Sequence, residues 1–515
     1  MDVVHPDEPG TGAPASALRP ATREAALAMG PEEFRRLGHA LVDSVATFLD
    51  SLPKRRVATG ESPGAIRALL DAERPLPAAG TDAADLLRSA TELLFNHSLF
   101  NGHPRFFGYI TSSPAPIGIL GDFLAAAVNA NVGAWRLAPV ATEIEAQAVR
   151  WIAELIGYPR ECGGLFVSGG NMANFVGLLA ARAAAAEWDI RRTGLAASTT
   201  RLRVYASPET HTWIHKATDL AGVGTDAIRW ISTDADLRMD TGALRTALTQ
   251  DRGAAERPLM VIGTAGSVST GVIDPLFDIA EICREFGAWF HVDGAYGAFA
   301  AAVPGSPRDL EALRLADSVA VDPHKWLYAP LEAGCILARH PDKLRTAFAY
   351  HPPYYHFGEE ATNYVDFGPQ NSRGFRALKV WLALRQVGRE GYASMIADDI
   401  QLSKRLFAAV AAHSELEAWT QSLSITTFRY VPADLRLQRE ETATAAYLNA
   451  LNEALLERIQ GSGEAFVSNA VVRGSYLLRA CIVNFHTGAG DVDAIPEIVA
   501  RLGREVDARM RRDQR

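Results

Sequence analysis

Short apolar runs and amphipathic stretches alternate through the middle of the chain. Runs of strand length occur at 164–167, 202–206, 259–264, 289–292, 318–321 and 335–338. Hydrophobic residues recur at helical spacing at 142–156, 174–185 and 274–286. Short apolar strands that alternate with helices are typical of a mostly parallel sheet flanked by helices. The pattern therefore predicts an α/β domain.

The two ends of the chain differ from this middle part. Residues 1–30 are rich in Ala, Pro and Gly and bury too little apolar surface to offset ordering entropy, so we expect a disordered tail. Apolar residues at helical spacing predict an N-terminal helical segment at 31–112. After a helix near 375–387 the order of helices and strands changes. This change predicts a large domain at 113–397 and a small α+β domain at 398–515.

The composition excludes several classes of partner. The 515 residues are 48% hydrophobic with a formal net charge of −9, and no stripe of Lys and Arg occurs, which argues against nucleic acid and acidic membranes. The four cysteines are scattered without metal-ligand spacing, so we expect no metal site. The sequence shows no signal peptide and no membrane span, and the expected location is the cytoplasm.

Two strand ends carry residues that pyridoxal phosphate chemistry requires. Asp293 follows the apolar run 289–292, and Lys325 follows the run 318–321 after a short turn. A pyridoxal enzyme holds the cofactor aldehyde as a Schiff base on a lysine and places a carboxylate against the pyridine nitrogen. Each residue alone is more simply a turn, cap or surface residue, but both lie where ligands of open α/β sheets bind. The pair therefore predicts a pyridoxal 5'-phosphate site.

A turn of small residues precedes this pair in the chain. Gly169, Gly170 and Asn171 follow the first strand and open a helix, where free N–H groups and the helix dipole favour a phosphate. His211 and Thr264 stand at the ends of two further strands. The imidazole could stack on the pyridine ring and touch a substrate carboxylate, and the threonine could support the ring. The simpler alternatives are an ordinary turn, a loop histidine and a structural threonine.

With these residues in this order, the chain resembles the group II pyridoxal phosphate decarboxylases, the family of aromatic L-amino acid, histidine and glutamate decarboxylases. Segments at 31–36, 103–108, 138–145 and 375–381 are also similar to family signatures, so the resemblance covers nearly everything from Pro31 onward. It implies the aspartate aminotransferase fold, which is fold type I, and a homodimer with active sites at the interface. It also implies decarboxylation of an L-amino acid to the amine and carbon dioxide.

The resemblance implies four catalytic residues. Lys325 would hold the cofactor covalently, Asp293 would pair with the pyridinium, and His211 would stack on the ring. A tyrosine on a mobile loop returns a proton to Cα in this family, and the local match places it at Tyr354, with Tyr355 as the alternative. The further cofactor-binding residues that we predict are Gly169, Gly170, Asn171, Thr264, Ala295 and His324.

Two positions depart from the family pattern for aromatic substrates. Asn101 and Gly133 stand where members that act on aromatic amino acids typically have Trp and Phe. Each change removes an apolar surface that contributes on the order of 1 to 3 kcal/mol. We therefore predict a wider or more polar pocket, with an aromatic or bulky L-amino acid as the first expectation. The predicted pocket residues are Asn101, Phe106, Tyr109, Ile110, Gly133 and Trp135.

Two smaller departures concern Asp322 and His486. Asp322 precedes the lysine turn where animal enzymes often have Asn, and its charge would repel a neighbouring phosphate. We expect this side chain to be turned aside or hydrogen-bonded to backbone amides. His486 stands where an Arg is frequent, and we assign it no role.

Other functions stay open at this point. The same cofactor serves transaminases, carbon–sulfur lyases and aldehyde synthases, which decarboxylate and oxidatively deaminate, and the substrate could be a non-aromatic amino acid. A tyrosine rather than a phenylalanine at position 354 favours simple decarboxylation. A non-enzymatic α/β binding module is the second alternative. A dinucleotide site is disfavoured because no Gly-x-Gly-x-x-Gly follows the first strand.

Overall fold

The computed structural model describes residues 25–254, 256–351 and 361–513, which form two compact units. The first unit takes in residues up to Asp50 together with Pro75–Phe95. The second takes in Ser51–Arg74 and the chain from Asn96 onward. The expected boundary at residue 112 is not one of these divisions and stays a prediction.

The first unit contains two amphipathic helices, α1 (Pro31–Ser51) and α3 (Ala83–Asn96). Two glutamates in the first turn of α1 stabilise the positive end of its helix dipole. Phe48 of α1 stacks on Phe95 of α3 with ring centroids 4.1 Å apart. Both helices also keep several large apolar side chains exposed, so the unit presents hydrophobic surface.

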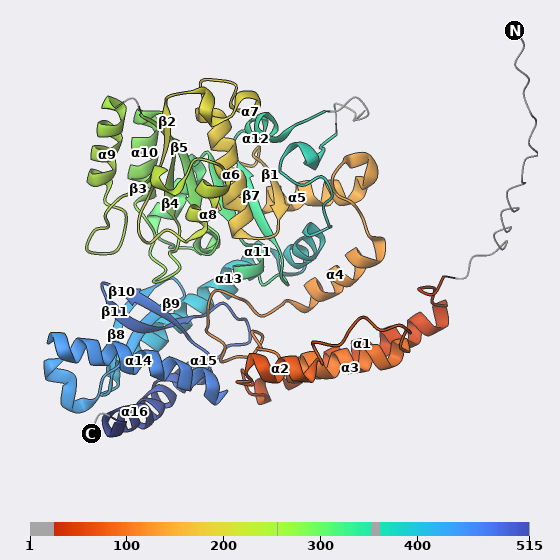
Figure 1. The fold of residues 1–515 in the computed structure, drawn as a ribbon, viewed down its shortest axis with the longest axis vertical. Coiled ribbons are helices and arrows are strands. Elements are labelled where there is room, and N and C mark those ends of the chain that lie inside the picture. The colour runs from red at the N-terminus through yellow and green to blue at the C-terminus, as the bar shows by residue number, and fades with distance from the viewer. Residues whose placement is uncertain (1–24, 255, 352–360, 514–515) are drawn as a thin grey trace, which may run out of the picture. The chain divides into compact units, whose positions relative to one another are not determined.

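The second unit contains a seven-stranded sheet with the order β1-β7-β6-β5-β4-β2-β3 (Figure 1). Its strands are β1 (Gly163–Val167), β2 (Arg201–Ala206), β3 (Ile228–Trp230), β4 (Glu256–Thr264), β5 (Trp289–Asp293), β6 (Ser318–Val321) and β7 (Gly334–Ala338). Within the described residues β7 runs antiparallel to both neighbours, and the other pairs are parallel. The predicted mostly parallel sheet is confirmed, and β3 is an additional strand.

Helices cover both faces of this sheet. Successive strand residues point to opposite sides, and apolar residues on both sides pack against helices. On one face Val261 and Val319 share a core with side chains of α5 (Pro139–Leu155) and α10 (Leu276–Phe286). On the other face Ile262 and Ala320 lie in clusters that include residues of α6 (Gly170–Ala185) and α8 (Trp213–Leu220). Further helices are α2 (Pro63–Leu69), α4 (Pro116–Val128), α7 (Ile190–Thr193), α9 (Thr241–Gly253), α11 (Pro323–Trp326) and α12 (Pro341–Phe348).

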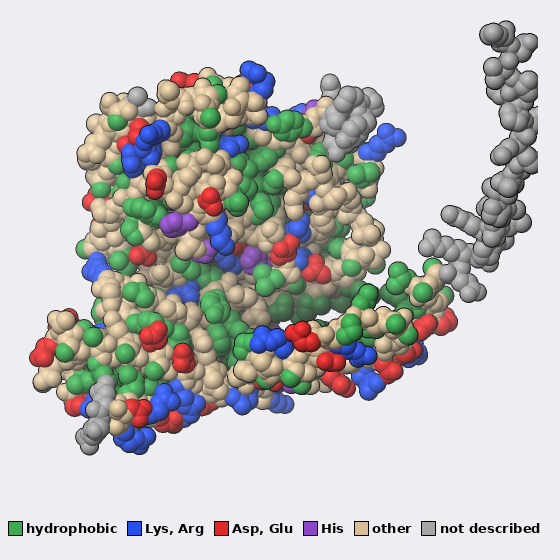
Figure 2. All heavy atoms as spheres, in the orientation of Figure 1, with side chains coloured by type: hydrophobic (Ala, Val, Ile, Leu, Met, Phe, Trp, Pro, Cys, Tyr) green, Lys and Arg blue, Asp and Glu red, His purple; other side chains and the backbone are tan. Residues whose placement is uncertain are grey.

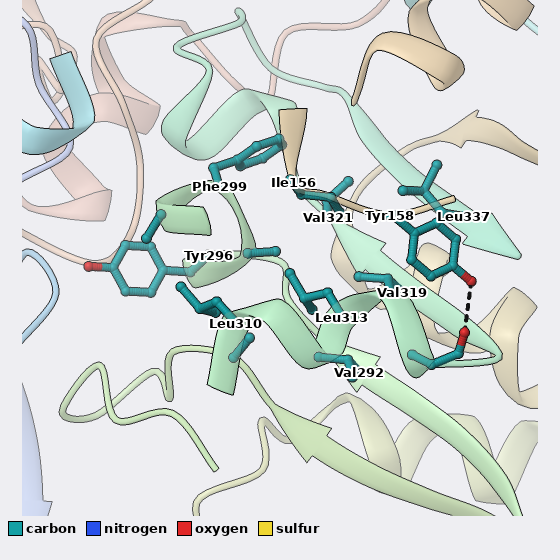
Figure 3. Close-up of a cluster of buried hydrophobic side chains, with 14 of the residues drawn as sticks. Ile156, Tyr158, Val292, Tyr296, Phe299, Leu310, Leu313, Val319, Val321 and Leu337 are labelled. Atoms are coloured by element: carbon teal, nitrogen blue, oxygen red, sulfur yellow. Dashed lines mark hydrogen bonds between the residues drawn. The ribbon is translucent and has the colours of Figure 1, made fainter. Parts of the chain in front are cut away.

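The core against the central strands is shown in Figure 3. Val292 of β5 and Val319 and Val321 of β6 pack there with Tyr296 and Phe299, which follow β5 in the chain. All five side chains are buried. This packing holds β5 and β6 in place, so the residues directly after these strands have defined positions.

The C-terminal part of the second unit is a smaller α+β domain with the antiparallel sheet order β10-β11-β9-β8 (Figure 1). Its elements are β8 (Leu416–Ser422), β9 (Ile425–Tyr430), α14 (Thr442–Ser462), β10 (Ser468–Val472), β11 (Ser475–Cys481), α15 (Ala489–Asp493) and α16 (Ile495–Asp513). Phe428, Leu451 and Leu478 belong to its own core. The predicted C-terminal α+β architecture is confirmed.

The long helix α13 (Ala377–Ala412) leads into this smaller domain. It is interrupted at Gly388, whose φ of +69° is a left-handed conformation that glycine adopts at little cost. The expected domain boundary at 397/398 falls inside this helix and stays a prediction. Among the described residues, no helix is both long and apolar enough to span a membrane.

Candidate functional site

The carboxyl ends of β4, β5 and β6 and the start of α6 meet at a cavity of about 400 Å³. Figure 2 shows histidine, acidic and basic side chains gathered near the middle of one molecular face. Predicted cofactor residues that line the cavity are Gly170, Asn171, His211, Thr264, Asp293, Ala295 and Lys325. Gly169 and His324 lie next to each other outside this lining. The sheet edge therefore assembles most of the predicted site.

Lys325 lies on the short helix α11, directly after β6. Its Nζ is 3.0 Å from Asp322 Oδ2, and its backbone N–H donates to the Asp322 carbonyl. Asp322 is buried and lines the cavity, and a Cβ atom at Gly170 would lie 2.7 Å from Asp322 Oδ2. The expectation that Asp322 is turned aside or bonded to backbone amides is therefore wrong. The Lys325 ammonium provides a counter-charge that lets the carboxylate face the cavity.

Asp293 is the last residue of β5 and the register partner of Thr264 on β4. Its Oδ2 accepts a hydrogen bond from the indole Nε1–H of Trp213 at 2.7 Å. Its Oδ1 accepts from the backbone N–H of Ala295 at 3.2 Å. Two donors on different oxygens define the plane of the carboxylate. The charge is thus held at the cavity wall in one orientation.

His211 lies in the loop between β2 and α8 and lines the same cavity. Burial lowers the pKa of this imidazole, and the neighbouring Asp293 carboxylate raises it in part. Its Nδ1 accepts a hydrogen bond from the backbone N–H of Trp213 at 3.2 Å. An imidazole that accepts at Nδ1 carries its proton on Nε2 when neutral. His211 can therefore stack on a ring as a neutral group and donate from Nε2.

Two buried oxygen atoms at the cavity, Thr264 Oγ1 and Asp322 Oδ1, have no hydrogen-bond partner among the described residues. The Thr264 backbone N–H donates to Asp274 Oδ2 at 2.8 Å, which fixes this residue at the end of β4. Burial raises the pKa of Asp274 to about 6. Because an unsatisfied buried hydroxyl costs about 1–3 kcal/mol, Thr264 is suited to bind a ligand.

The lining fits pyridoxal phosphate. Lys325 contributes an amine, Asp293 a carboxylate and Thr264 a free hydroxyl. The helix α6 begins at Gly170, and a helix start binds phosphate through its N–H groups and dipole. A side chain at Gly170 would collide with Asp322 and crowd Ala295, so this position requires glycine.

Arg479 of β11 is a cavity residue that sequence reasoning missed. It comes from the smaller domain, is buried, and donates from Nη1 to Ser468 Oγ at 2.8 Å. Within the part of the chain that is described, its Nε and Nη2 have no partner. Burial lowers the pKa of this guanidinium. One charged residue in the apolar run 477–483 was the signal that could have revealed it.

The predicted substrate residues separate into two groups. Tyr109 and Ile110 line the cavity, and Tyr109 has a left-handed backbone with φ of +52°. Phe106 is instead buried against Phe466, with ring centroids 5.3 Å apart. Asn101 donates its side-chain amide to the Ser112 carbonyl. Neither Phe106 nor Asn101 is part of the cavity lining.

Gly133 and Trp135 also lie outside the cavity lining. Trp135 is partly exposed, lines a separate surface groove, and donates its indole N–H to Glu143. A Cβ atom at Gly133 would meet the Asn371 carbonyl, so no side chain fits there without rearrangement. Contacts of these residues with substrate are therefore not made within this chain's own cavity, and their roles stay predictions.

Three residues discussed from the sequence complete this comparison. Tyr354 and Tyr355 lie outside the described residues. His486 is absent from the cavity lining, and its ring contacts Phe485 at a centroid distance of 4.3 Å. Burial lowers the pKa of His486.

Comparisons with known proteins agree with this chemistry. Residues 63–431 match the family described as the pyridoxal-dependent decarboxylase conserved domain. The chain is 31% identical over 485 residues to an aromatic-L-amino-acid decarboxylase of Bacillus atrophaeus, covering 93% of this chain and 97% of that relative. It is 30% identical over 467 residues to a phenylacetaldehyde synthase of Petunia hybrida, covering 88% of this chain and 91% of that relative.

Solved structures are similar over nearly the same extent. The crystal structure of Oryza sativa TDC with PLP and tryptamine has a TM-score of 0.86 and 27% identity, covering 94% of this chain and 99% of that chain. Catharanthus roseus tryptophan decarboxylase in complex with L-tryptophan has a TM-score of 0.82 and 26% identity, covering 93% of this chain and 99% of that chain. These neighbours confirm fold type I. The chain therefore belongs to the pyridoxal-dependent decarboxylase family and is a pyridoxal phosphate-dependent amino acid decarboxylase.

Proposed function

We propose that this enzyme converts an aromatic or other bulky L-amino acid to the amine and carbon dioxide. The observation that carries the proposal is one cavity that contains the Lys325 amine, the Asp293 carboxylate and the Arg479 guanidinium. Tyr109 and Ile110 add apolar surface to its wall. The Bacillus atrophaeus relative is named for aromatic amino acids, and the Catharanthus roseus neighbour is in complex with L-tryptophan. Both names support an aromatic substrate.

The residues of this cavity would hold the cofactor at fixed points. Bound pyridoxal phosphate supplies an electron-accepting ring that takes up the electron pair left at Cα when carbon dioxide departs. Lys325 would bind the cofactor covalently, and Asp293 would hold its charge for the ring nitrogen. His211 would stack on the ring, and burial lowers its pKa, which favours the neutral imidazole. Thr264 would support the ring or its hydroxyl with its own free hydroxyl group.

Arg479 is the proposed anchor for the substrate carboxylate. Its unpaired Nε and Nη2 donors match the two oxygens of a carboxylate, which guanidinium groups bind in a bidentate way. Ser468 holds Nη1, so the remaining donors have a defined direction. An amino acid that enters the cavity would satisfy donors that are otherwise buried without a partner.

The enzyme is further proposed to act as a homodimer with shared active sites. Leu120, Phe123 and Leu124 on α4 are each more than half exposed, which is unusual for large apolar side chains on one helix. Gly133 and Trp135 follow α4 in the chain and lie outside the cavity of their own subunit. A second copy docked on α4 would cover this surface and could bring those residues to the neighbouring cavity.

Two further assignments belong to this proposal. The proton that returns to Cα comes from Tyr354, or from Tyr355 as the alternative, both outside the described residues. We place the enzyme in the cytoplasm, where thiols stay reduced, because its four cysteines are buried and free.

A product screen tests the proposed reaction. The purified protein, supplied with pyridoxal phosphate, is assayed with all common L-amino acids and with hydroxylated aromatic ones. Equal amounts of carbon dioxide and amine, formed fastest from an aromatic amino acid, are expected. Ammonia, peroxide and aldehyde would instead assign the chain to the aldehyde synthases. The Lys325→Ala variant is the control and should lose the visible absorbance of the bound cofactor.

A further inference from the structure

Trp213 connects the loop of His211 to the carboxylate of Asp293, which lies 80 residues further along the chain. The indole is fully buried at the start of α8, and its Nε1 lies 2.7 Å from Asp293 Oδ2. The other oxygen of Asp293 accepts from the Ala295 backbone at 3.2 Å. An indole N–H is a donor only, so this bond has one direction and needs an oxygen that accepts.

Trp213 is itself held in place beneath the sheet edge. Its ring meets the edge of His291 at a centroid distance of 5.9 Å and an interplanar angle of 78°. The two nitrogens of His291 are hydrogen-bonded to Ser318 Oγ and Asn174 Oδ1, both at 2.7 Å. Burial lowers the pKa of His291 to about 4, so this imidazole is neutral near pH 7 and adds no positive charge near Asp293. The indole therefore has a fixed ring position.

The backbone of Trp213 serves the second catalytic group. Its N–H donates to His211 Nδ1 at 3.2 Å, which directs the other ring nitrogen of His211 away from this turn. The segment from His211 to Trp213 thus carries the stacking imidazole and also the donor that holds Asp293.

We propose that Trp213 is a positioning residue of this decarboxylase, whose indole N–H fixes the plane of the Asp293 carboxylate against the ring nitrogen of bound cofactor. The inference rests on the proposed role of Asp293. A carboxylate held by one donor only can rotate about its Cβ–Cγ bond, and small displacements of a catalytic group are costly to rate. The fixed plane would keep the Asp293 charge aligned with the ring nitrogen.

A pair of variants isolates the N–H group. Trp213→Gln and Trp213→Met both remove the indole ring, and the two new side chains have similar volumes. Only glutamine retains an N–H donor, and its amide nitrogen is separated from Cα by the same number of bonds as Nε1 of tryptophan. Trp213→Met should lower kcat roughly 10- to 100-fold with little change in KM, because a charge-assisted bond is lost. Trp213→Gln should recover most of kcat. The visible circular dichroism of bound cofactor should change in the Met variant and return in the Gln variant.

Trp381→Phe is the control, because it removes a partly buried indole hydrogen bond to Gln147 that lies outside the cavity. Its kcat and visible circular dichroism should equal those of the wild type. If Trp213→Gln and Trp213→Met have the same kcat and spectrum, the inference is overturned. If both variants fail to fold, Trp213→Phe is measured in their place. A Trp213→Phe variant with the spectrum and kcat of the wild type would also overturn the inference. A wild-type protein that does not decarboxylate would instead reject the proposed function.

Discussion

Replacing Arg479 by Met should leave the free energy of unfolding nearly unchanged and weaken the use of substrate by the enzyme. Arg479 is buried on β11, with one hydrogen bond to Ser468 and two nitrogens that have no partner in the described chain. Methionine keeps much of the apolar stem and removes the charge. The variant therefore tests whether the guanidinium is present for the fold or for a ligand.

The structure sets the size of both effects. Removing the bond to Ser468 costs about 1.5–3 kcal/mol at most, since its donor is charged. Removing two unsatisfied buried donors returns about 1–3 kcal/mol or more. The free energy of unfolding should therefore stay within about 1 kcal/mol of the wild-type value. Loss of charged hydrogen bonds to a substrate carboxylate should lower kcat/KM roughly 10- to 150-fold.

Urea unfolding without substrate and initial rates of amine formation measure these two quantities. Arg429→Met is the matched control, because Arg429 is equally buried on the neighbouring strand β9 but is paired with Glu417 at 2.6 Å. It should lower the free energy of unfolding and leave kcat/KM unchanged. A large loss of stability in Arg479→Met together with a wild-type kcat/KM would refute the reasoning, since Arg479 would then be structural.

Three further predictions concern the cofactor, the pH and the product. Asp322→Asn should tighten cofactor binding roughly 10-fold in an equilibrium titration, because an anion beside the turn proposed to bind phosphate is removed; weaker binding would contradict this. His291 has its pKa lowered by burial from 6.5 to about 4, so its contribution to stability is complete above pH 6.5 and is lost as the pH falls toward 4. Between pH 7 and 4.5 the wild type should lose roughly 2–3 kcal/mol more unfolding free energy than His291→Gln, and equal losses would show that another group titrates. Tyr354→Phe should retain cofactor and divert product from amine toward aldehyde; an unchanged amine yield would assign the proton donor elsewhere.

Much of the architecture follows from local sequence. The apolar runs that end at Val292 and Val321 are buried strands, and the residues after them reach one sheet edge. The turn at Gly169 and Gly170 and the start of the helix that follows are also set by residues close in the chain. Local patterns therefore suffice to place Asp293, Lys325 and the turn that is predicted to bind phosphate, because the ends of parallel strands meet wherever such a sheet forms.

Other features could not be read from local patterns. The antiparallel direction of β7 and the short strand β3 depend on how distant segments pair. Gly133 and Trp135 were assigned to the pocket from family resemblance, but the chain places them outside its own cavity. A pattern along one chain contains no information on which residues a second copy would contribute.

The sequence by itself determined most strands of the large sheet, the lysine and the carboxylate, since each depends on residues close in the chain. Only the tertiary structure decided the direction of Asp322, the bond from Trp213 to Asp293 and the entry of Arg479 from the second sheet. These three features join side chains from separate elements. Their positions depend on packing and on the partners available to buried charges, and propensity along the chain encodes neither.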